Sequence, residues 1–168
     1  MSSEIHIRPA RPADRSAVTQ LFRRAYPPLL APDYDPGVLR AALPLITTAQ
    51  PALLDCGTYF VAEDAAGRVV GAGGWTDVSP ARGVGAERQG HVRHVATDPG
   101  RLRQGVARRL VETSLASARE FGMERLHCMS TRTAQSFYHA MGFKPVGEIE
   151  LTLAPGVYFP AVQMQRGL

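Results

Sequence analysis

An arginine-rich segment around Gly105 combines the residue types of an anion-binding turn. The segment runs from Thr97 to Leu110 and reads TDPGRLRQGVARRL. Gly105 has no Cβ, so its backbone can approach a ligand closely, and the free N–H groups at the start of a following helix attract negative charge. Arginine-rich helix starts are also common on solvated surfaces, so the segment alone leaves both interpretations open.

The residues before this segment indicate a strand. Gln89–Thr97 reads QGHVRHVAT and alternates in part between apolar and polar residues. Gly105 therefore lies at a strand-to-helix turn, where the N–H groups of a helix start can bind a phosphate or pyrophosphate. The helix is expected to continue through Val106, Leu110 and Leu115 and to end at Gly122, a residue type suited to helix C-termini.

Proline positions and apolar spacing predict helices in the N-terminal third of the chain. A short strand is expected over Ile5–Arg8. Apolar residues three and four apart predict an amphipathic helix that starts at Pro12 and ends at the Pro27-Pro28 pair. Pro44 and Pro51 are expected to break the next segment into short helices. These helices are predicted over Val38–Leu43 and Ile46–Leu54.

The rest of the chain predicts strands around two helices. Two apolar runs separated by an Asp-Ala-Ala-Gly turn predict an antiparallel hairpin. A short helix is expected over Thr133–Ala140. The strands predicted after the N-terminal third are Thr58–Glu63, Arg68–Trp75, Gln89–Thr97, Glu124–Met129, Phe143–Val146 and Phe159–Met164. The predicted fold class is α/β, with a mixed, mostly antiparallel central sheet of roughly six to seven strands flanked by about four helices.

Length and composition favour one domain with an excess of positive charge. The chain has 168 residues, 45% of them hydrophobic, so residues 1–168 can bury the core of one compact domain. The formal net charge of +4 suits an acidic ligand, whether nucleic acid, a membrane surface or a phosphorylated cofactor. Charge alone does not choose among these partners.

Cysteine usage and the N-terminus bear on the compartment. The two cysteines, Cys56 and Cys128, have neither metal-ligand spacing nor the pattern of a disulfide framework. We therefore expect no metal site and a reduced, cytoplasmic compartment. No stretch approaches the roughly 18 apolar residues of a membrane span, and the N-terminal residues lack the apolar run of a signal peptide. Hence we expect no membrane partner.

Three motifs together resemble the GCN5-related N-acetyltransferases (GNAT). They are a strand ending in VATDP (residues 95–99), the loop QGVA (104–107) and the run FYHAMGF (137–143). The resemblance spans nearly the whole chain, and the Phe-Tyr-x-x-x-Gly-Phe run is its most discriminating part. It implies the acyl-CoA N-acyltransferase fold and one N-acetyltransferase domain that transfers an acetyl group from acetyl-coenzyme A to a primary amine.

The resemblance also implies where acetyl-coenzyme A binds. In the family the backbone at the end of the fourth strand pairs with the pantetheine arm, and the loop after it binds the pyrophosphate. Leu102 stands where the family pattern has Arg or Gln, so Arg101, Arg103 or Arg108 is expected to compensate. The implied cofactor-binding residues are Val95, Ala96, Thr97, Arg103, Gln104, Gly105, Val106, Ala107 and Arg108.

Tyr138 is the general acid that the resemblance implies. A phenol near the sulfur can protonate the coenzyme A thiolate that leaves when the tetrahedral intermediate collapses. The alternative is a core tyrosine, because Phe137, Tyr138 and Met141 also have the spacing of a buried helix face.

A histidine suits the general base that takes the proton of the amine. His91 is the first candidate, because a histidine at its position serves in some family members as the base or starts a water relay; a water relay without a side-chain base is the alternative. Strict alternation along the strand puts His91 on one face with Arg93 and Val95, and His94 on the other. Other, weaker candidates are Glu63 and Asp77, whereas His139 is expected to point away.

In the family, acceptor specificity comes from the first helices and the loops beside them, so the resemblance implies an acceptor site at residues 26–54 and 75–89. Tyr34, Asp35 and Trp75 could shape an amine pocket there, although each is also a common turn or packing residue. The sequence predicts a small-molecule or peptide amine without naming it, and a homodimer is compatible with the resemblance. A catalytically silent acyl-coenzyme A binding or sensing module is the alternative function. Nucleic-acid binding is disfavoured, because the basic residues gather at one turn without interleaved aromatic residues.

Overall fold

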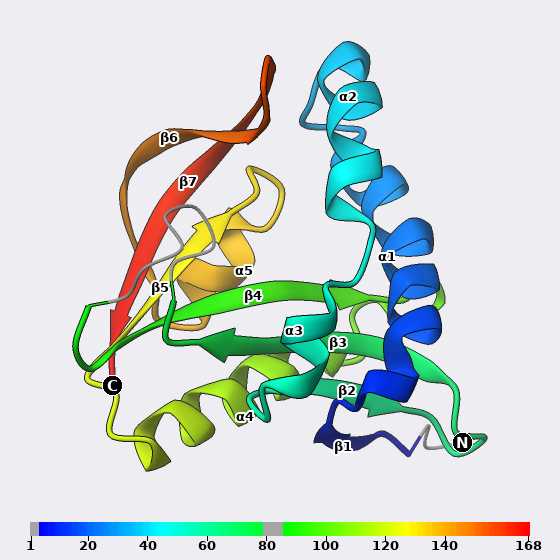
Figure 1. Ribbon diagram of the computed structural model, residues 1–168, viewed down its shortest axis with the longest axis vertical. Helices are drawn as coiled ribbons and strands as arrows, with labels where there is room; N and C mark the ends of the chain where they lie inside the picture. The colour runs from blue at the N-terminus through cyan, green and yellow to red at the C-terminus, as the bar shows by residue number, and fades with distance from the viewer. Residues whose placement is uncertain (1–3, 79–85) are drawn as a thin grey trace.

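A seven-stranded sheet in the order β1-β2-β3-β4-β5-β7-β6 forms the centre of the computed structural model (Figure 1). The structure describes residues 4–78 and 86–168. β4 and β5 are parallel, and every other neighbouring pair is antiparallel. The strands are β1 (His6–Pro9), β2 (Tyr59–Glu63), β3 (Val69–Thr76), β4 (Gln89–Thr97), β5 (Arg125–Ser130), β6 (Lys144–Ala154) and β7 (Val157–Gly167). The predicted mixed, mostly antiparallel α/β sheet is confirmed.

Helices cover both faces of this sheet. α1, α2 and α3 lie on one face, and α4 and α5 lie on the other (Figure 1). Two short 3₁₀ turns, η1 (Pro12–Asp14) and η2 (Pro99–Arg101), precede α1 and α4. The helices are α1 (Arg15–Leu30), α2 (Pro36–Ile46), α3 (Pro51–Asp55), α4 (Val106–Glu120) and α5 (Gln135–Ala140).

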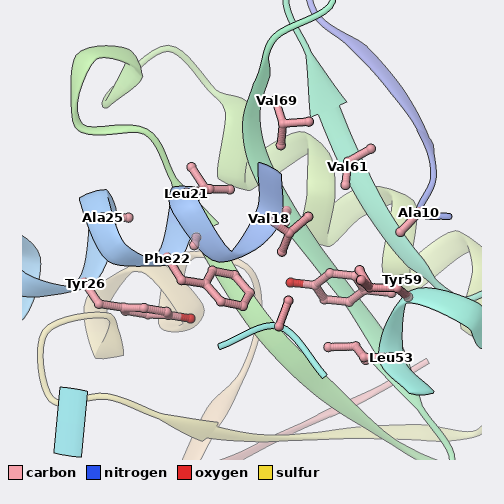
Figure 2. Packing of buried hydrophobic residues seen from close by; sticks show 14 of the residues in the cluster. Ala10, Val18, Leu21, Phe22, Ala25, Tyr26, Leu53, Tyr59, Val61 and Val69 are labelled. Atoms are coloured by element: carbon pink, nitrogen blue, oxygen red, sulfur yellow. The ribbon is translucent and has the colours of Figure 1, made fainter. Parts of the chain in front are cut away.

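The core under α1 joins aromatic rings from helix and sheet. Phe22 and Tyr26 of α1 face Tyr59 of β2, and Val18 and Val61 pack beside them (Figure 2). The Phe22 and Tyr26 ring centroids lie 5.5 Å apart. All five residues are buried, with at most 6% of the surface of any of them exposed. This packing holds α1 against the sheet, where the helix also contacts β4.

Glycines set the position of α4 on the opposite face. Gly105 precedes the helix at φ +80°, and Gly122 follows it at φ +79°, both in the left-handed region that favours glycine. A Cβ on Gly71 of β3 would lie 2.6 Å from Val106 Cγ1 and 3.0 Å from Leu110 Cδ1. The missing side chain at Gly71 therefore lets the first turns of α4 pack directly on the sheet.

The prolines do not end the N-terminal helices, so that prediction was wrong. α1 continues through Pro27 and Pro28, and the Ala31 N–H donates to the Pro27 carbonyl at 3.2 Å. A proline inside a helix loses one N–H donor, but burial of Tyr26 and Leu30 in this turn compensates for the loss. α2 begins at Pro36 and likewise runs through Pro44. Pro51 begins α3, the position that proline commonly takes in a helix.

The C-terminal hairpin is longer than the apolar runs suggested. β6 and β7 each have 11 residues and turn at Gly156, where φ is +77°. Most of β6 is exposed and includes polar residues such as Glu148 and Glu150. The sequence therefore lacks the apolar pattern from which a buried strand is predicted. Pairing with β7 rather than burial extends this strand.

Candidate active site

β4 and β5 separate after three paired residues and open the sheet. Their register runs from Gln89 opposite Arg125 to His91 opposite His127. Beyond His91, β4 continues to Thr97 without a β5 partner among the described residues. A cleft of about 570 Å³ lies at this opening. It is lined by β4, β5 and α5 together with Tyr26 of α1, the end of α2 and the β6–β7 hairpin.

A β-bulge in β4 changes which side chains share a face. The β3–β4 register shifts between Ala72 and Gly74, and His94 takes φ +35°. Arg93 and His94 therefore both lie on the face of the sheet that α1 covers. There Arg93 donates a hydrogen bond to Thr76, and the His94 ring stacks on Phe22 with centroids 5.4 Å apart. The prediction of strict alternation was wrong at this point.

Because of the bulge, His91 and His94 lie on the same face of the sheet. Val95, which the alternation placed with His91, instead packs against the cluster on the α4 and α5 face. Ala96 packs in the core under α1, and Thr97 pairs with Gly71. The three predicted pantetheine contacts thus stand on the unpaired stretch of β4, where backbone groups toward β5 are available to a ligand.

The two strand histidines differ in their relation to the cleft. The His91 ring stacks on His127 with centroids 5.1 Å apart, and His91 is absent from the described lining of the cleft. His94 lines the cleft, and its carbonyl accepts a hydrogen bond from the Tyr59 hydroxyl at 2.7 Å. Burial, followed by the charge of Arg93, lowers the pKa of His94 to about 4.

His91 is also neutral at physiological pH. Burial first, then His127 and Arg93, lower the pKa of His91 to about 4, although Asp77 opposes the shift. A neutral imidazole can accept a proton, but a pKa this low makes it a weak base. Of the weaker candidates, Glu63 forms an ion pair with Arg8, and Asp77 is exposed at the end of β3.

Tyr138 enters the cleft from α5 and is also part of the core. Its side chain is 6% exposed, packs edge-on against Phe143 at 5.5 Å and lines the cleft opposite α1. The Cys128 thiol lies beside it. Burial raises the pKa of Tyr138 well above its usual value, so the phenol keeps its proton at neutral pH. His139, the next residue, is exposed as expected.

The start of α4 offers backbone N–H groups to an anion. Gly105 is the N-cap residue and, among the described residues, no side chain caps this helix start. Arg103 takes φ +62° and is exposed together with Gln104, whereas Val106 is buried and Ala107 is partly buried. The Arg108 guanidinium pairs with Glu112 at 3.0 Å. If an anion binds at this helix start, backbone N–H groups rather than side chains would contribute most of its contacts.

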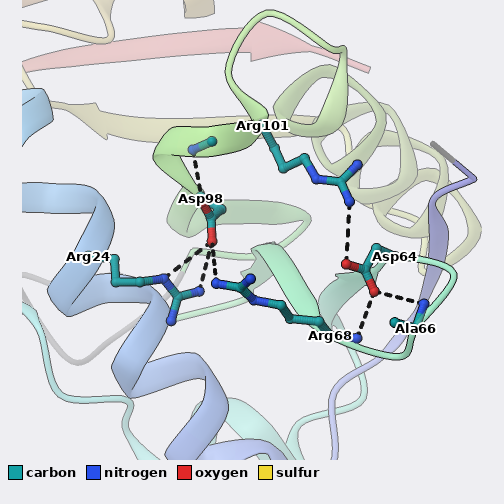
Figure 3. Close-up of polar contacts among 7 residues, drawn as sticks. Arg24, Asp64, Ala66, Arg68, Asp98 and Arg101 are labelled. Carbon is teal, nitrogen blue, oxygen red and sulfur yellow. Dashed lines mark hydrogen bonds and ion pairs between the residues drawn. The ribbon is translucent and has the colours of Figure 1, made fainter. Parts of the chain in front are cut away.

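An ion-pair network supports the turn between β4 and α4 (Figure 3). The Asp98 carboxylate accepts a hydrogen bond from the Gly100 N–H at 2.9 Å and pairs with Arg24 at 3.0 Å and Arg68 at 3.6 Å. Burial alone would raise the pKa of Asp98, but the Gly100 N–H and Arg24 hold it below its usual value.

Arg101 is linked to the same network through Asp64, with which it pairs at 3.3 Å. The Asp64 carboxylate in turn accepts a hydrogen bond from the Arg68 backbone N–H at 2.9 Å. The Arg101 guanidinium is therefore engaged on the protein and is less suited to compensate for Leu102 than the exposed Arg103. The sequence offered no signal for these pairs, because Asp98 meets Arg24 across 74 positions and Arg101 meets Asp64 across 37.

A second cavity of about 420 Å³ adjoins the cleft. Gln50 and Arg93 line both, and Trp75, Thr76 and Asp77 line the second. Of the predicted acceptor residues, Trp75 therefore borders a cavity, although its Nε1–H donates to Ser117 of α4 at 3.0 Å.

Two other predicted acceptor residues have structural roles. The Tyr34 ring stacks on Phe159 at 4.5 Å, and its hydroxyl donates to the Pro160 carbonyl at 2.7 Å. Asp35 precedes α2 as its N-cap residue. Residues 79–85 of the predicted acceptor loop lie outside the described residues.

Within the described residues, no cluster of three or more His, Cys, Asp or Glu side chains could hold a metal ion. None of the described helices is long and apolar enough to cross a membrane.

A mixed sheet that opens between a parallel strand pair, followed by an uncapped helix start after the first of these strands, is typical of the acyl-CoA N-acyltransferase class of fold. The model of the acetyltransferase (GNAT) family matches residues 16–143. The chain belongs to this family. No curated protein matches the chain significantly in sequence.

Solved structures with the same fold extend over nearly the whole chain. A GCN5-related N-acetyltransferase from Rhodopseudomonas palustris, described as a class-II aminotransferase, is 17% identical, with a TM-score of 0.81 and coverage of 100% of this chain and 99% of its own. PaiA N-acetyltransferase from Thermoplasma acidophilum, in complex with coenzyme A, is 13% identical, with a TM-score of 0.73. The match covers 98% of this chain and 99% of that one.

A third neighbour is larger. N-acetylglutamate synthase from Neisseria gonorrhoeae, complexed with coenzyme A and N-acetyl-glutamate, is 19% identical, with a TM-score of 0.64. The match covers 100% of this chain and 36% of that one. Acetyl-coenzyme A is the co-substrate typical of the family, and two of these three neighbours were crystallised with coenzyme A.

Proposed function

We propose that this protein transfers the acetyl group of acetyl-coenzyme A to a primary amine by direct attack in a ternary complex. The observation that carries the proposal is the opening between β4 and β5, which brings together an unpaired strand edge and the buried Tyr138. From the end of that edge the chain leads through η2 to the uncapped start of α4. Each element suits a different part of the same co-substrate. Family membership supports the same activity.

The co-substrate is proposed to lie along β4 and end at α4. Backbone groups of Val95, Ala96 and Thr97 would pair with the amide-containing pantetheine arm as a β5 partner would, because they face the opening. The N–H groups at the start of α4 would bind the pyrophosphate, with Arg103 adding charge from the exposed loop.

Tyr138 is the proposed general acid. The amine nitrogen forms a bond to the acetyl carbon, the carbon–sulfur bond breaks, and the departing thiolate takes the phenolic proton. The phenol carries its proton at neutral pH, as a general acid must, although the raised pKa makes it a weaker acid than an exposed tyrosine. The phenol is then reprotonated through the water-accessible cleft.

The proton lost by the amine is proposed to leave along β4. His91, neutral but outside the cleft lining, would receive it through water, whereas His94 in the lining could receive it directly. Because both pKa values are near 4, neither imidazole can hold the proton for long at neutral pH, and the solvent is its final acceptor.

The decisive experiment incubates the protein with acetyl-coenzyme A and a panel of primary amines. Coenzyme A and acetylated amine should appear in equal amounts, measured by chromatography with mass detection because the exposed Cys56 would disturb a thiol-reactive dye. Binding of coenzyme A measured by calorimetry without turnover of any amine would instead support the sensing module. Absence of both binding and turnover would contradict both functions.

A further inference from the structure

Arg93 is a partly buried cation in the wall of the active-site cleft. Its Nε is buried and has no hydrogen-bond partner among the described residues. One terminal nitrogen donates to the Thr76 hydroxyl at 3.1 Å, and the other reaches the Gln50 side-chain oxygen at 3.5 Å. These two neutral acceptors leave most of the five guanidinium donors without a strong partner.

No carboxylate among the described residues pairs with Arg93. Asp77 and Glu150, which line the two cavities, are both exposed and form no ion pair with it. By contrast, Arg8, Arg24 and Arg101 each pair with an acidic side chain. A desolvated cation without a counter-charge is costly, which is consistent with the lowered pKa of Arg93.

The position of Arg93 favours contact with the acceptor rather than with the co-substrate. It lies directly before the bulge residue His94 and faces α1 and α3, whereas Tyr138 and the start of α4 lie on the other face. With Gln50, it lines both the cleft and the second cavity. A molecule that enters the cleft from the α1 side would therefore meet its guanidinium.

The charge of Arg93 restricts which amines fit here. It repels an ammonium group, so a purely cationic amine gains nothing from this wall. A carboxylate can take two parallel hydrogen bonds from a guanidinium, which would satisfy the unused donors and offset the repulsion. An acceptor with both groups is neutral overall.

We propose that the acceptor is an amino acid whose carboxylate binds the Arg93 guanidinium while its amine faces the acetyl group. The proposal rests on the proposed function, because it names the substrate class of the same site. It favours free amino acids over amines that lack a nearby carboxylate.

The test compares each of a panel of free amino acids with its own amide, since the two differ only in the anionic group. For the best acceptor, kcat/KM should be higher for the acid than for the amide. Arg93→Met should lower this acid-to-amide ratio by about 10- to 100-fold, mainly through KM, because hydrogen bonds to charged groups are strong. Arg93→Lys should retain part of the ratio. Arg125→Met, which removes an exposed charge, is the matched control and should leave it unchanged.

A binding measurement separates this proposal from the proposed function. N-acetyl-amino acids should bind the coenzyme A-saturated protein more tightly than the matching N-acetyl amides, and Arg93→Met should remove the difference. Amine turnover without a preference for the acid would overturn the role of Arg93, as would an acid-to-amide ratio of kcat/KM that Arg93→Met leaves unchanged. Neither result would contradict the proposed acetyltransferase activity. Failure of the protein to bind coenzyme A would overturn both.

Discussion

At the scale of single residues, Tyr138 joins packing and chemistry in one side chain. The two predictions for it, a core tyrosine and a general acid, are compatible, because the residue is buried and also lines the cleft. Its ring contacts Phe137 and Phe143, so removing only the hydroxyl leaves the packing intact. This makes the acid role separable by substitution.

Tyr138→Phe should lower kcat by about 100-fold, because the thiolate would leave without a positioned proton donor. The KM for acetyl-coenzyme A and the melting temperature should change little, since the aromatic contacts remain. Steady-state kinetics and circular dichroism measure these quantities. Tyr158→Phe, on the exposed part of the hairpin, is the control. An unchanged kcat for Tyr138→Phe would exclude the phenol as the acid.

The two strand histidines differ by position rather than by pKa. Because both titrate near pH 4, kcat/KM should show no histidine inflection between about pH 5 and 9, and any rise in this range should follow the amine of the acceptor. Replacing the proton-accepting histidine with Gln should lower kcat at every pH in this window. His139→Gln, an exposed neighbour of Tyr138, is the control.

The comparison of His91→Gln with His94→Gln identifies the proton path. Loss of kcat in His91→Gln alone would support a water relay along β4, and loss in His94→Gln alone would support direct transfer in the cleft. If both variants keep the wild-type rate with an unchanged pH profile, water alone carries the proton.

At the scale of elements, the packing of α4 on β3 positions the helix start that we propose binds the pyrophosphate. Gly71→Ala should destabilise the protein by roughly 1–3 kcal/mol, because the new methyl would overlap Val106 and press on Leu110. The displaced helix start should also raise the KM for acetyl-coenzyme A. Urea unfolding and steady-state kinetics measure the two effects. In the control Gly147→Ala, a Cβ meets nothing within 4 Å. Equal stability of the two variants would contradict this account of the packing.

Local patterns in the sequence predicted most elements, and long-range contacts explain the failures. Gln89–Thr97 and the start of α4 were predicted where the structure has them, because alternation and glycine act locally. The ends of α1 and α2 were not, since tertiary burial stabilises turns that contain Pro27 and Pro44. The bulge at His94 depends on pairing with β3, and no pattern within β4 reveals it.

At the scale of the whole molecule, three residue pairs between β4 and β5 join the two parts of the sheet. β1 to β4 form one part, and β5, β7 and β6 form the other. A ligand along the open edge of β4 would contact both parts and replace the missing pairing. Co-substrate binding and the stability of the sheet should therefore be coupled.

Coenzyme A at about 100 times its dissociation constant should stabilise the protein by about 2.7 kcal/mol and raise its melting temperature by roughly 5–10 °C. Hydrogen exchange should slow in residues 92–97 of β4 and 128–130 of β5, on both sides of the opening. Adenosine 3′,5′-bisphosphate, which lacks the pantetheine arm, is the matched control. It should protect the start of α4 without slowing exchange in β5, because it cannot span the gap. Equal protection of β5 by both ligands would mean that the pantetheine arm does not join the two parts of the sheet.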